Sequence, residues 1–381
     1  MTEINDRVKK LMDRLVDSGQ EVGLQCAAYL DGEMIVDCWS GIADEATGRK
    51  VNGGSLFTCW STTKGWAATC VHILADRGRL QYGDPISRYW PEFAAQGKSK
   101  ATVLDALTHR VGVPQLPTGT TPEMMCDWDA MCSAIAGMKP KWTPGTKVGY
   151  HAFTYGWLTG EIVRRIDGRP IAKFAQDEIC KPLGIDSFFM GIPGRVENRV
   201  APFRVEPPPP DAPVILPGSL TRQAMPALFM NSETLNRPDL RRASLPGAGG
   251  IMNARAIARH YAMFAGYGEL DGARILSKRT VNLIRKVNSD EVDMVANRRV
   301  VRGLAYGLGG SAEGGGSPAM GRSRRAFGHG GYGGSLGYAD PEMGMSFGFT
   351  KTLLKVVPDP KKASAYLVAE EIRKALRREA R

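Results

Sequence analysis

The sequence predicts a mixed α/β (α+β) fold, in which both ends of the chain build one central antiparallel sheet. Near the N-terminus, the apolar runs 22–30 and 34–41 flank Asp31-Gly32, a dipeptide typical of a two-residue β-hairpin. Near the C-terminus, three short apolar segments have the pattern of strands, at 327–330, 335–340 and 345–350. Helical patterns and long loops fill the middle of the chain. A sheet flanked by helices, with a mainly helical insertion, is therefore expected.

The remaining elements follow from local patterning. The first 12 residues mix charges with apolar positions, so they predict an amphipathic surface helix rather than an apolar secretion signal. Residues 65–77 predict a helix that Gly78 ends. Further helical patterns lie at 101–110, 127–138, 153–166, 171–180, 254–266 and about 361–378. The glycine-rich segment 309–316 is expected to be a flexible loop between strands. The proline-rich segment 206–218 is too proline-dense for regular structure and is expected to be a groove wall or a spacer.

Length and composition limit the function classes. A chain of 381 residues is long enough for two closely packed domains. We expect a discontinuous sheet domain from 1–90 and 250–381, and a helical insertion at 91–249 that lines an active-site groove. No apolar run approaches the roughly 20 residues of a membrane span, so a cytoplasmic protein is expected. Seven cysteines without Cys-x-x-Cys pairs favour free thiols, and five scattered histidines predict no metal or other cofactor.

The net charge of +11 raises the possibility of a nucleic-acid binder. The basic clusters, however, are short and scattered, and we assign them to solvated loops or the C-terminal helix: Arg241-Arg242, Arg298-Arg299, Arg322-Ser323-Arg324-Arg325 and Arg377-Arg378. No nucleic-acid partner is expected. Salt-sensitive retention on a polyanion would support that weaker alternative.

Ser61-Thr62-Thr63-Lys64 is the only Ser-x-x-Lys in the chain. On a helix, a spacing of three places both side chains on one face, so the serine can meet a proton acceptor. A serine hydroxyl needs such an acceptor to attack a carbonyl. Burial and the nearby helix N-terminus would both lower the pKa of Lys64. The competing interpretation is that Ser61 caps the helix, since Ser is a favoured N-cap, and that Lys64 is an ordinary exposed lysine.

Two further segments accompany this motif. Trp142-Thr143-Pro144-Gly145 precedes Tyr150, and His329-Gly330-Gly331 lies near the C-terminus. With Ser61 and Lys64, they resemble the serine β-lactamase and penicillin-binding-protein superfamily, specifically its class C and family VIII carboxylesterase branch. The resemblance spans nearly the whole chain. It implies a β-lactamase-like fold with an active site between the sheet domain and the helical insertion.

The resemblance also implies roles for individual residues. Ser61 would be the nucleophile, and Lys64 and Tyr150 its acid/base pair. His329, Gly330 and Gly331 would line the site, and the backbone N–H groups of Tyr332 and Ser61 would form the oxyanion hole. Without the resemblance, Tyr150 would be a core tyrosine and the glycine-rich segment a close-packed strand.

This sequence departs from the β-lactamase pattern at two places. Tyr150-His151-Ala152 replaces Tyr-Ser-Asn, which removes the asparagine. His329-Gly330-Gly331 replaces Lys-Thr-Gly, whose lysine contributes to binding the substrate carboxylate. Both changes argue against efficient β-lactam hydrolysis, so we expect a carboxylesterase with a small-molecule ester substrate.

Several alternatives remain at this point. An acyltransferase would use the same acyl-enzyme, as would a β-lactamase or a D-amino-acid amidase or peptidase; a catalytically silent scaffold is the non-enzyme alternative. Gly333-Gly334-Ser335-Leu336-Gly337 matches the Gly-x-Ser-x-Gly nucleophile elbow, but Ser335 starts a predicted strand and no later histidine follows. His109 is interpreted as structural. The sequence sets neither the substrate identity nor the oligomeric state.

Overall fold

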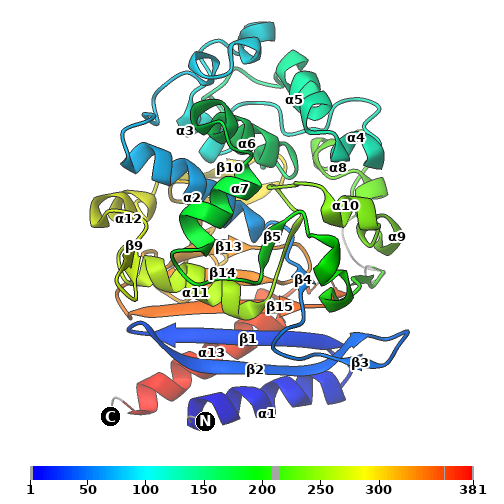
Figure 1. The fold of residues 1–381 in the computed structure, drawn as a ribbon, viewed down its shortest axis with the longest axis vertical. Coiled ribbons are helices and arrows are strands. Elements are labelled where there is room, and N and C mark those ends of the chain that lie inside the picture. Colours follow the sequence, from blue (N-terminus) through cyan, green and yellow to red (C-terminus); the bar gives the residue numbers. More distant parts are fainter. Residues whose placement is uncertain (1–2, 208–213, 356, 380–381) are drawn as a thin grey trace.

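A nine-stranded antiparallel sheet dominates the computed structural model, which describes residues 3–207, 214–355 and 357–379 (Figure 1). Its strand order is β10-β11-β12-β13-β14-β15-β1-β2-β3. In chain order the strands are β1 (Gly23–Leu30), β2 (Glu33–Asp44), β3 (Arg49–Lys50), β10 (Ser289–Asp293), β11 (Arg298–Arg302), β12 (Gly307–Leu308), β13 (Phe327–Gly330), β14 (Leu336–Asp340) and β15 (Met345–Lys351). The mixed α/β fold predicted from the sequence is confirmed.

Strand β1 joins the two ends of the chain. It pairs with β15 from Leu24 opposite Lys351 to Leu30 opposite Met345, and with β2 on its other side. The β1–β2 turn has positive φ at both Asp31 (48°) and Gly32 (86°), as a two-residue hairpin requires. The prediction that both chain ends form one sheet is therefore confirmed. Strands β10 to β12 extend this sheet, and the sequence reasoning missed them.

Helices cover both faces of the sheet. Helices α1 (Glu3–Asp17) and α13 (Ser364–Glu379) pack on one face, and α11 (Ala254–Ala265) packs on β1, β14 and β15 from the other (Figure 1). Two strand glycines permit this close approach. A Cβ at Gly337 would lie 2.4 Å from the Tyr261 ring, and one at Gly348 would lie 2.3 Å from the Ala254 carbonyl oxygen.

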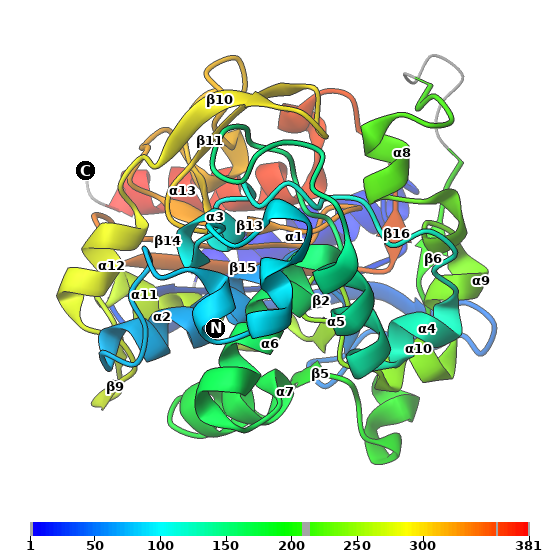
Figure 2. The ribbon, with the colours of Figure 1, turned by 90° about the horizontal axis from the view of Figure 1, so that it is seen from above.

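The large core lies on the α11 side of the sheet and continues into the helical part of the chain. Helix α2 (Thr63–Asp76) links the two parts, since it contacts β13 as well as α6 and α7 (Figure 2). The other helices are α3 (Val103–Leu107), α4 (Pro122–Cys126), α5 (Trp128–Gly137), α6 (Thr154–Asp167), α7 (Ile171–Ala175), α8 (Leu220–Ala224), α9 (Ser232–Leu235), α10 (Pro238–Arg242) and α12 (Lys278–Ile284). A buried α2 is well placed to hold a site between the sheet and the helices.

Short strands complete the fold. They are β4 (Phe57–Thr58), β7 (Gly250–Met252) and β5 (Phe188–Met190) in one small sheet, β6 (Arg204–Val205) with β16 (Leu353–Leu354), and β8 (Glu269–Leu270) with β9 (Ala273–Arg274). Strand β5 belongs to the predicted insertion 91–249, yet it pairs with β7 of the predicted sheet domain. The domain boundaries stay a prediction. Of the proline-rich segment 206–218, residues 208–213 lie outside the described residues.

The structure tests where the sequence analysis placed the basic clusters and the cysteines. Arg298-Arg299 lies on strand β11 and Arg241-Arg242 in helix α10, so placing these pairs in loops or the C-terminal helix was wrong. All seven cysteines are free thiols, and all but Cys126 are buried. Within the described ranges, no cluster of three or more His, Cys, Asp or Glu side chains could hold a metal ion. No helix in the same ranges is long and apolar enough to cross a membrane.

Candidate active site

Ser61 lies directly before helix α2. The helix begins at Thr63 with Thr62 at the N-cap position, so Ser61 lies two residues before its first residue. No side-chain hydrogen bond caps this helix at Thr62. The Ser61 backbone carbonyl accepts the Lys64 N–H at 3.0 Å, and the Ser61 hydroxyl oxygen lies 3.1 Å from Lys64 Nζ. The geometry therefore favours a serine–lysine pair over a helix cap.

Lys64 is fully buried behind Ser61. Its Nζ donates to the carbonyl oxygens of Ala152 at 2.6 Å and Gly247 at 2.7 Å. Burial lowers the pKa of Lys64 well below its ordinary value, and the positive charge of Arg302 lowers it further. A neutral amine has two N–H groups and one lone pair. With both N–H groups on carbonyls, the lone pair of neutral Lys64 faces the Ser61 hydroxyl.

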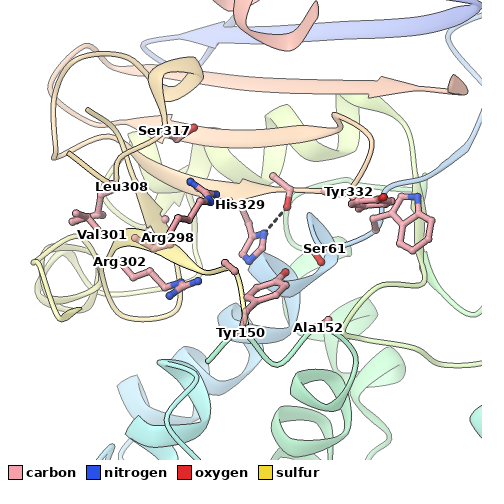
Figure 3. Close-up of a pocket in the computed structure, with 18 of the residues that line it drawn as sticks. Ser61, Tyr150, Ala152, Arg298, Val301, Arg302, Leu308, Ser317, His329 and Tyr332 are labelled. Carbon is pink, nitrogen blue, oxygen red and sulfur yellow. Dashed lines mark hydrogen bonds between the residues drawn. The ribbon is translucent and has the colours of Figure 1, made fainter. Parts of the chain in front are cut away.

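Tyr150 lies beside Ser61 (Figure 3). Lys64 Nζ is 4.8 Å from the centre of the Tyr150 ring. Burial raises the pKa of the Tyr150 phenol, although a hydrogen bond with Ser61 and the charge of Arg302 act in the opposite direction. The phenol is therefore protonated near neutral pH. The Tyr150 backbone N–H donates to Asp293 Oδ1 at 3.0 Å, which fixes the chain at this residue.

Asp293 and Arg302 form a buried ion pair that the sequence reasoning missed. Arg302 Nη2 donates to Asp293 Oδ2 at 2.8 Å, and their side chains are 9% and 0% exposed. Asp293 Oδ1 also accepts the N–H groups of Val295 and Ala296, both at 2.9 Å. Both charges come from the β10–β11 hairpin, whose polar sequence gave little indication of burial. One signal was available: Asn297, a residue type that favours turns, lies between the two strands and adopts φ 51° there.

Strand β13 supplies His329 and Gly330 to the site. The His329 ring centre is 6.3 Å from that of Tyr150, and its Nδ1 donates to the Gly330 carbonyl oxygen at 2.8 Å (Figure 3). Burial lowers the pKa of His329, and the charge of Lys64 lowers it further. His329 is therefore neutral near pH 7.

Gly331 brings the backbone of Tyr332 close to Ser61. A Cβ at Gly331 would lie 2.3 Å from the Cys59 carbonyl oxygen, so a side chain there would force the two segments apart. The Tyr332 ring contacts the Trp60 ring edge-on at 5.6 Å. No hydrogen bond joins the N–H of Ser61 or of Tyr332 to any other described residue. Two free backbone donors on adjacent segments are suited to bind an oxyanion.

One cavity of about 390 Å³ brings most of the predicted residues together. Ser61, Tyr150, His329, Gly330, Gly331 and Tyr332 all line it, while Lys64 lies buried behind Ser61. Phe153, Met225, Met230 and Ala248 contribute apolar side chains to its wall, and Arg298 and Arg302 contribute charged ones.

Two residues that the sequence reasoning set aside do not line this cavity. Ser335 is buried, and its hydroxyl donates to the Cys59 carbonyl oxygen at 2.7 Å. It precedes strand β14 rather than a helix, so it does not form a nucleophile elbow. His109 is buried against Tyr150, and its Nδ1 accepts the His151 N–H at 3.1 Å.

Comparisons with known proteins identify the family of this chain. The sequence family described as Beta-lactamase matches residues 8–370. The esterase/beta-lactamase LipL of Mycobacterium tuberculosis is 33% identical over 340 residues, which cover 84% of this chain and 75% of LipL. A family VIII carboxylesterase crystal structure has a TM-score of 0.88 at 29% identity, over 97% of this chain and 98% of that chain. A penicillin-binding-protein homologue from Caulobacter crescentus has a TM-score of 0.87 at 30% identity, over 98% of each chain. The chain therefore belongs to the Beta-lactamase family, as its motifs indicated.

Proposed function

We propose that this protein is a serine carboxylesterase that forms an acyl-enzyme at Ser61. The observation that carries the proposal is the environment of Lys64, whose two backbone acceptors leave its lone pair facing the Ser61 hydroxyl. A lysine in this arrangement can take a proton near neutral pH, which an exposed lysine cannot do. The esterase/beta-lactamase LipL and the family VIII carboxylesterase support the choice of reaction class.

Acylation begins when Ser61 Oγ attacks the ester carbonyl carbon and passes its proton to Lys64 Nζ. The carbonyl oxygen becomes an oxyanion and accepts hydrogen bonds from the free N–H groups of Ser61 and Tyr332. When the tetrahedral intermediate collapses, the bond to the alcohol oxygen breaks. Tyr150 donates its phenolic proton to that oxygen, and the proton on Lys64 then replaces the one that Tyr150 lost. The products are the alcohol and acyl-Ser61.

Deacylation follows the same path in reverse, with water in place of the alcohol. Tyr150 and Lys64 remove a proton from water as its oxygen attacks the acyl carbon. The intermediate collapses, the bond to Ser61 Oγ breaks, and the proton returns to the serine. An acyltransferase differs only at this step, because another alcohol or an amine attacks instead of water.

Intact-mass spectrometry tests the proposal. Wild type and Ser61→Ala are incubated with a fluorophosphonate and, separately, with a p-nitrophenyl short-chain ester. We expect one covalent adduct on wild type and none on Ser61→Ala, together with ester turnover that the substitution abolishes. Ser335→Ala is the matched control, since it removes the other candidate nucleophile, and it should keep the adduct. An adduct that survives Ser61→Ala, or no adduct on wild type, contradicts the mechanism.

β-Lactam hydrolysis is the second candidate, because the relative LipL is described as an esterase/beta-lactamase. Ala152 occupies the position where the β-lactamases have asparagine, and it contributes only its carbonyl oxygen, to Lys64. Nitrocefin turnover by wild type, compared with p-nitrophenyl ester turnover on the same enzyme preparation, separates the two. We expect the ester to have the larger kcat/KM by about a hundredfold, the approximate worth of one oriented polar contact in a transition state.

A further inference from the structure

Strand β11 contributes two arginines to the wall of the cavity. Arg298, Val300, Val301 and Arg302 all line the cavity, and Arg298 and Arg302, an even number of residues apart on the strand, share one face of it. Figure 3 shows Arg298 and Arg302 on the far side of Tyr150 and His329 from Ser61. Two cationic side chains therefore border the part of the cavity that lies beyond Tyr150.

Arg302 has an unused donor in this wall. Its Nη2 donates to Asp293, whereas its Nη1 is buried and has no hydrogen-bond partner among the described residues. The side chain is nine-tenths buried, so the ion pair also holds its orientation. A buried guanidinium with an open donor is costly to leave unsatisfied and is well suited to a carboxylate oxygen. The guanidinium is turned toward Tyr150 in Figure 3.

Arg298 adds a charge that the fold does not neutralise. It is exposed and forms no ion pair with any residue that the structure describes. Its neighbour Arg299 pairs with Asp290 at 2.7 Å and does not line the cavity. No Asp or Glu is among the described residues that line the cavity, and the Asp293 oxygens are occupied within the protein. The cavity wall therefore carries a net positive charge.

The distance of this wall from Tyr150 indicates whether the acyl half or the alcohol half of an ester substrate would contact it. Arg302 Cζ lies 5.8 Å from the centre of the Tyr150 ring. In the proposed mechanism, Tyr150 protonates the alcohol oxygen, so the alcohol half of the ester leaves on the Tyr150 side. The apolar part of the wall, with Phe153 and Met230, then remains for the acyl half.

We propose that Arg302 and Arg298 form a carboxylate-binding subsite for the leaving group, and that the substrates are esters whose alcohol or phenol half bears a carboxylate. The proposal rests on the proposed ester hydrolysis and assigns its substrate class. The subsite differs in its residues from the lysine of the Lys-Thr-Gly motif, whose position here holds the neutral His329. Both of its arginines come from β11: Arg302 is held by its ion pair with Asp293, and Arg298 forms no ion pair with any described residue.

Matched phenyl esters test the proposal. The probe is 4-acetoxybenzoate and its neutral counterpart is 4-acetoxybenzamide, which has the same acyl group and a similar shape. The measured quantity is the ratio of their kcat/KM values, so that a general loss of activity cancels. The variants are Arg302→Gln and Arg298→Gln. Arg299→Gln is the control, because it removes an arginine from the same strand outside the cavity.

We expect wild type to prefer the carboxylate ester by roughly ten- to hundredfold, the range for hydrogen bonds to a charged group. Either cavity variant should reduce that ratio about tenfold, and Arg299→Gln should leave it unchanged. Added sodium chloride should lower the wild-type ratio, because Arg298 is exposed. A wild-type ratio near one, or a preference that both cavity variants retain, overturns the proposal while ester hydrolysis stands.

Binding to Ser61→Ala separates the subsite from the reaction. By isothermal titration calorimetry, this variant should bind 4-acetoxybenzoate more tightly than the benzamide, and Arg302→Gln in the same background should remove the difference. If no ester is turned over but this difference is measured, the proposed hydrolysis falls and the carboxylate subsite stands. Equal binding of both compounds overturns the subsite.

Discussion

Asp293 offers a sharp test of how the site is held together. Its carboxylate accepts three backbone N–H groups and the Arg302 guanidinium, and one of the three N–H groups belongs to Tyr150. Asp293→Ala removes all four acceptor contacts. Asp293→Asn keeps an oxygen for the backbone groups but places an amide donor against Arg302. The two variants therefore separate backbone support from the ion pair.

The expected magnitudes follow from burial. Asp293→Ala leaves Arg302 buried without its partner, which typically costs about 3–5 kcal/mol of unfolding free energy. Asp293→Asn breaks the same ion pair and should cost a similar 3–5 kcal/mol, and Asp293→Ala should exceed it by about 1–3 kcal/mol because the three backbone N–H groups also lose their acceptor. Loosening Tyr150 should lower kcat by about a hundredfold in the alanine variant, the usual effect of a displacement near 1 Å. The asparagine variant should lose about tenfold.

Urea denaturation and initial rates on the same preparations measure both effects. Burial alone would raise the pKa of Asp293, but the charge of Arg302 and the backbone donors outweigh it and hold the pKa below its usual value. The stability that this carboxylate contributes is therefore present above its unfolded pKa near 4 and lost as pH falls through the folded pKa. The difference between wild type and Asp293→Asn should shrink below about pH 4. An alanine variant with unchanged kcat and a stability loss under about 1 kcal/mol would refute the reasoning.

Three further predictions use other parts of the site. Burial lowers the pKa of Lys64 and raises that of Tyr150. A plot of kcat/KM against pH should therefore fall in acid, as Lys64 gains a proton, and stay level up to about pH 10. A profile that rises only near the ordinary lysine pKa of about 10.4 would contradict this. Lys98→Met should cost about 2–4 kcal/mol of unfolding free energy, because three backbone carbonyl oxygens accept hydrogen bonds from the Nζ of this buried lysine. It should leave kcat unchanged, because Lys98 lies outside the cavity. Chemical denaturation measures the first effect and ester kinetics the second. Gly331→Ala should lower kcat by about a hundredfold with little change in KM, because its Cβ would clash with the Cys59 carbonyl oxygen and move the Tyr332 N–H away from that of Ser61. An unchanged kcat would argue against this oxyanion hole.

Local spacing explains what the sequence could predict. Ser61 and Lys64 lie three residues apart at a helix start, so their contact depends on backbone geometry that a sequence pattern encodes. The Asp31-Gly32 turn was predictable for the same reason, since few dipeptides tolerate positive φ at both positions. The partners of Tyr150 and His329 required the family resemblance, because nothing in their spacing along the chain brings them together.

The residues that were missed depend on tertiary burial. Asp293 and Arg302 lie in a hairpin rich in charges, and a polar pattern normally indicates a solvated strand. Here the hairpin extends the sheet beyond β12 and turns two of its charges inward toward Tyr150. Lys98 was hidden similarly: nothing in its neighbours shows that three carbonyl groups will surround it. Such pairings are properties of the assembled fold.

The pairing of β1 with β15 also constrains how this protein is made. A ribosome adds roughly 5–20 residues per second, so β1 emerges long before its partner and waits with one edge unpaired. Contacts between such distant segments slow folding, because a large loop must close before they form. An unpaired edge is also a template for other chains. We therefore expect the nascent chain to be most prone to aggregation before β15 emerges, and chaperone supply or a lower growth temperature to raise the yield of folded protein.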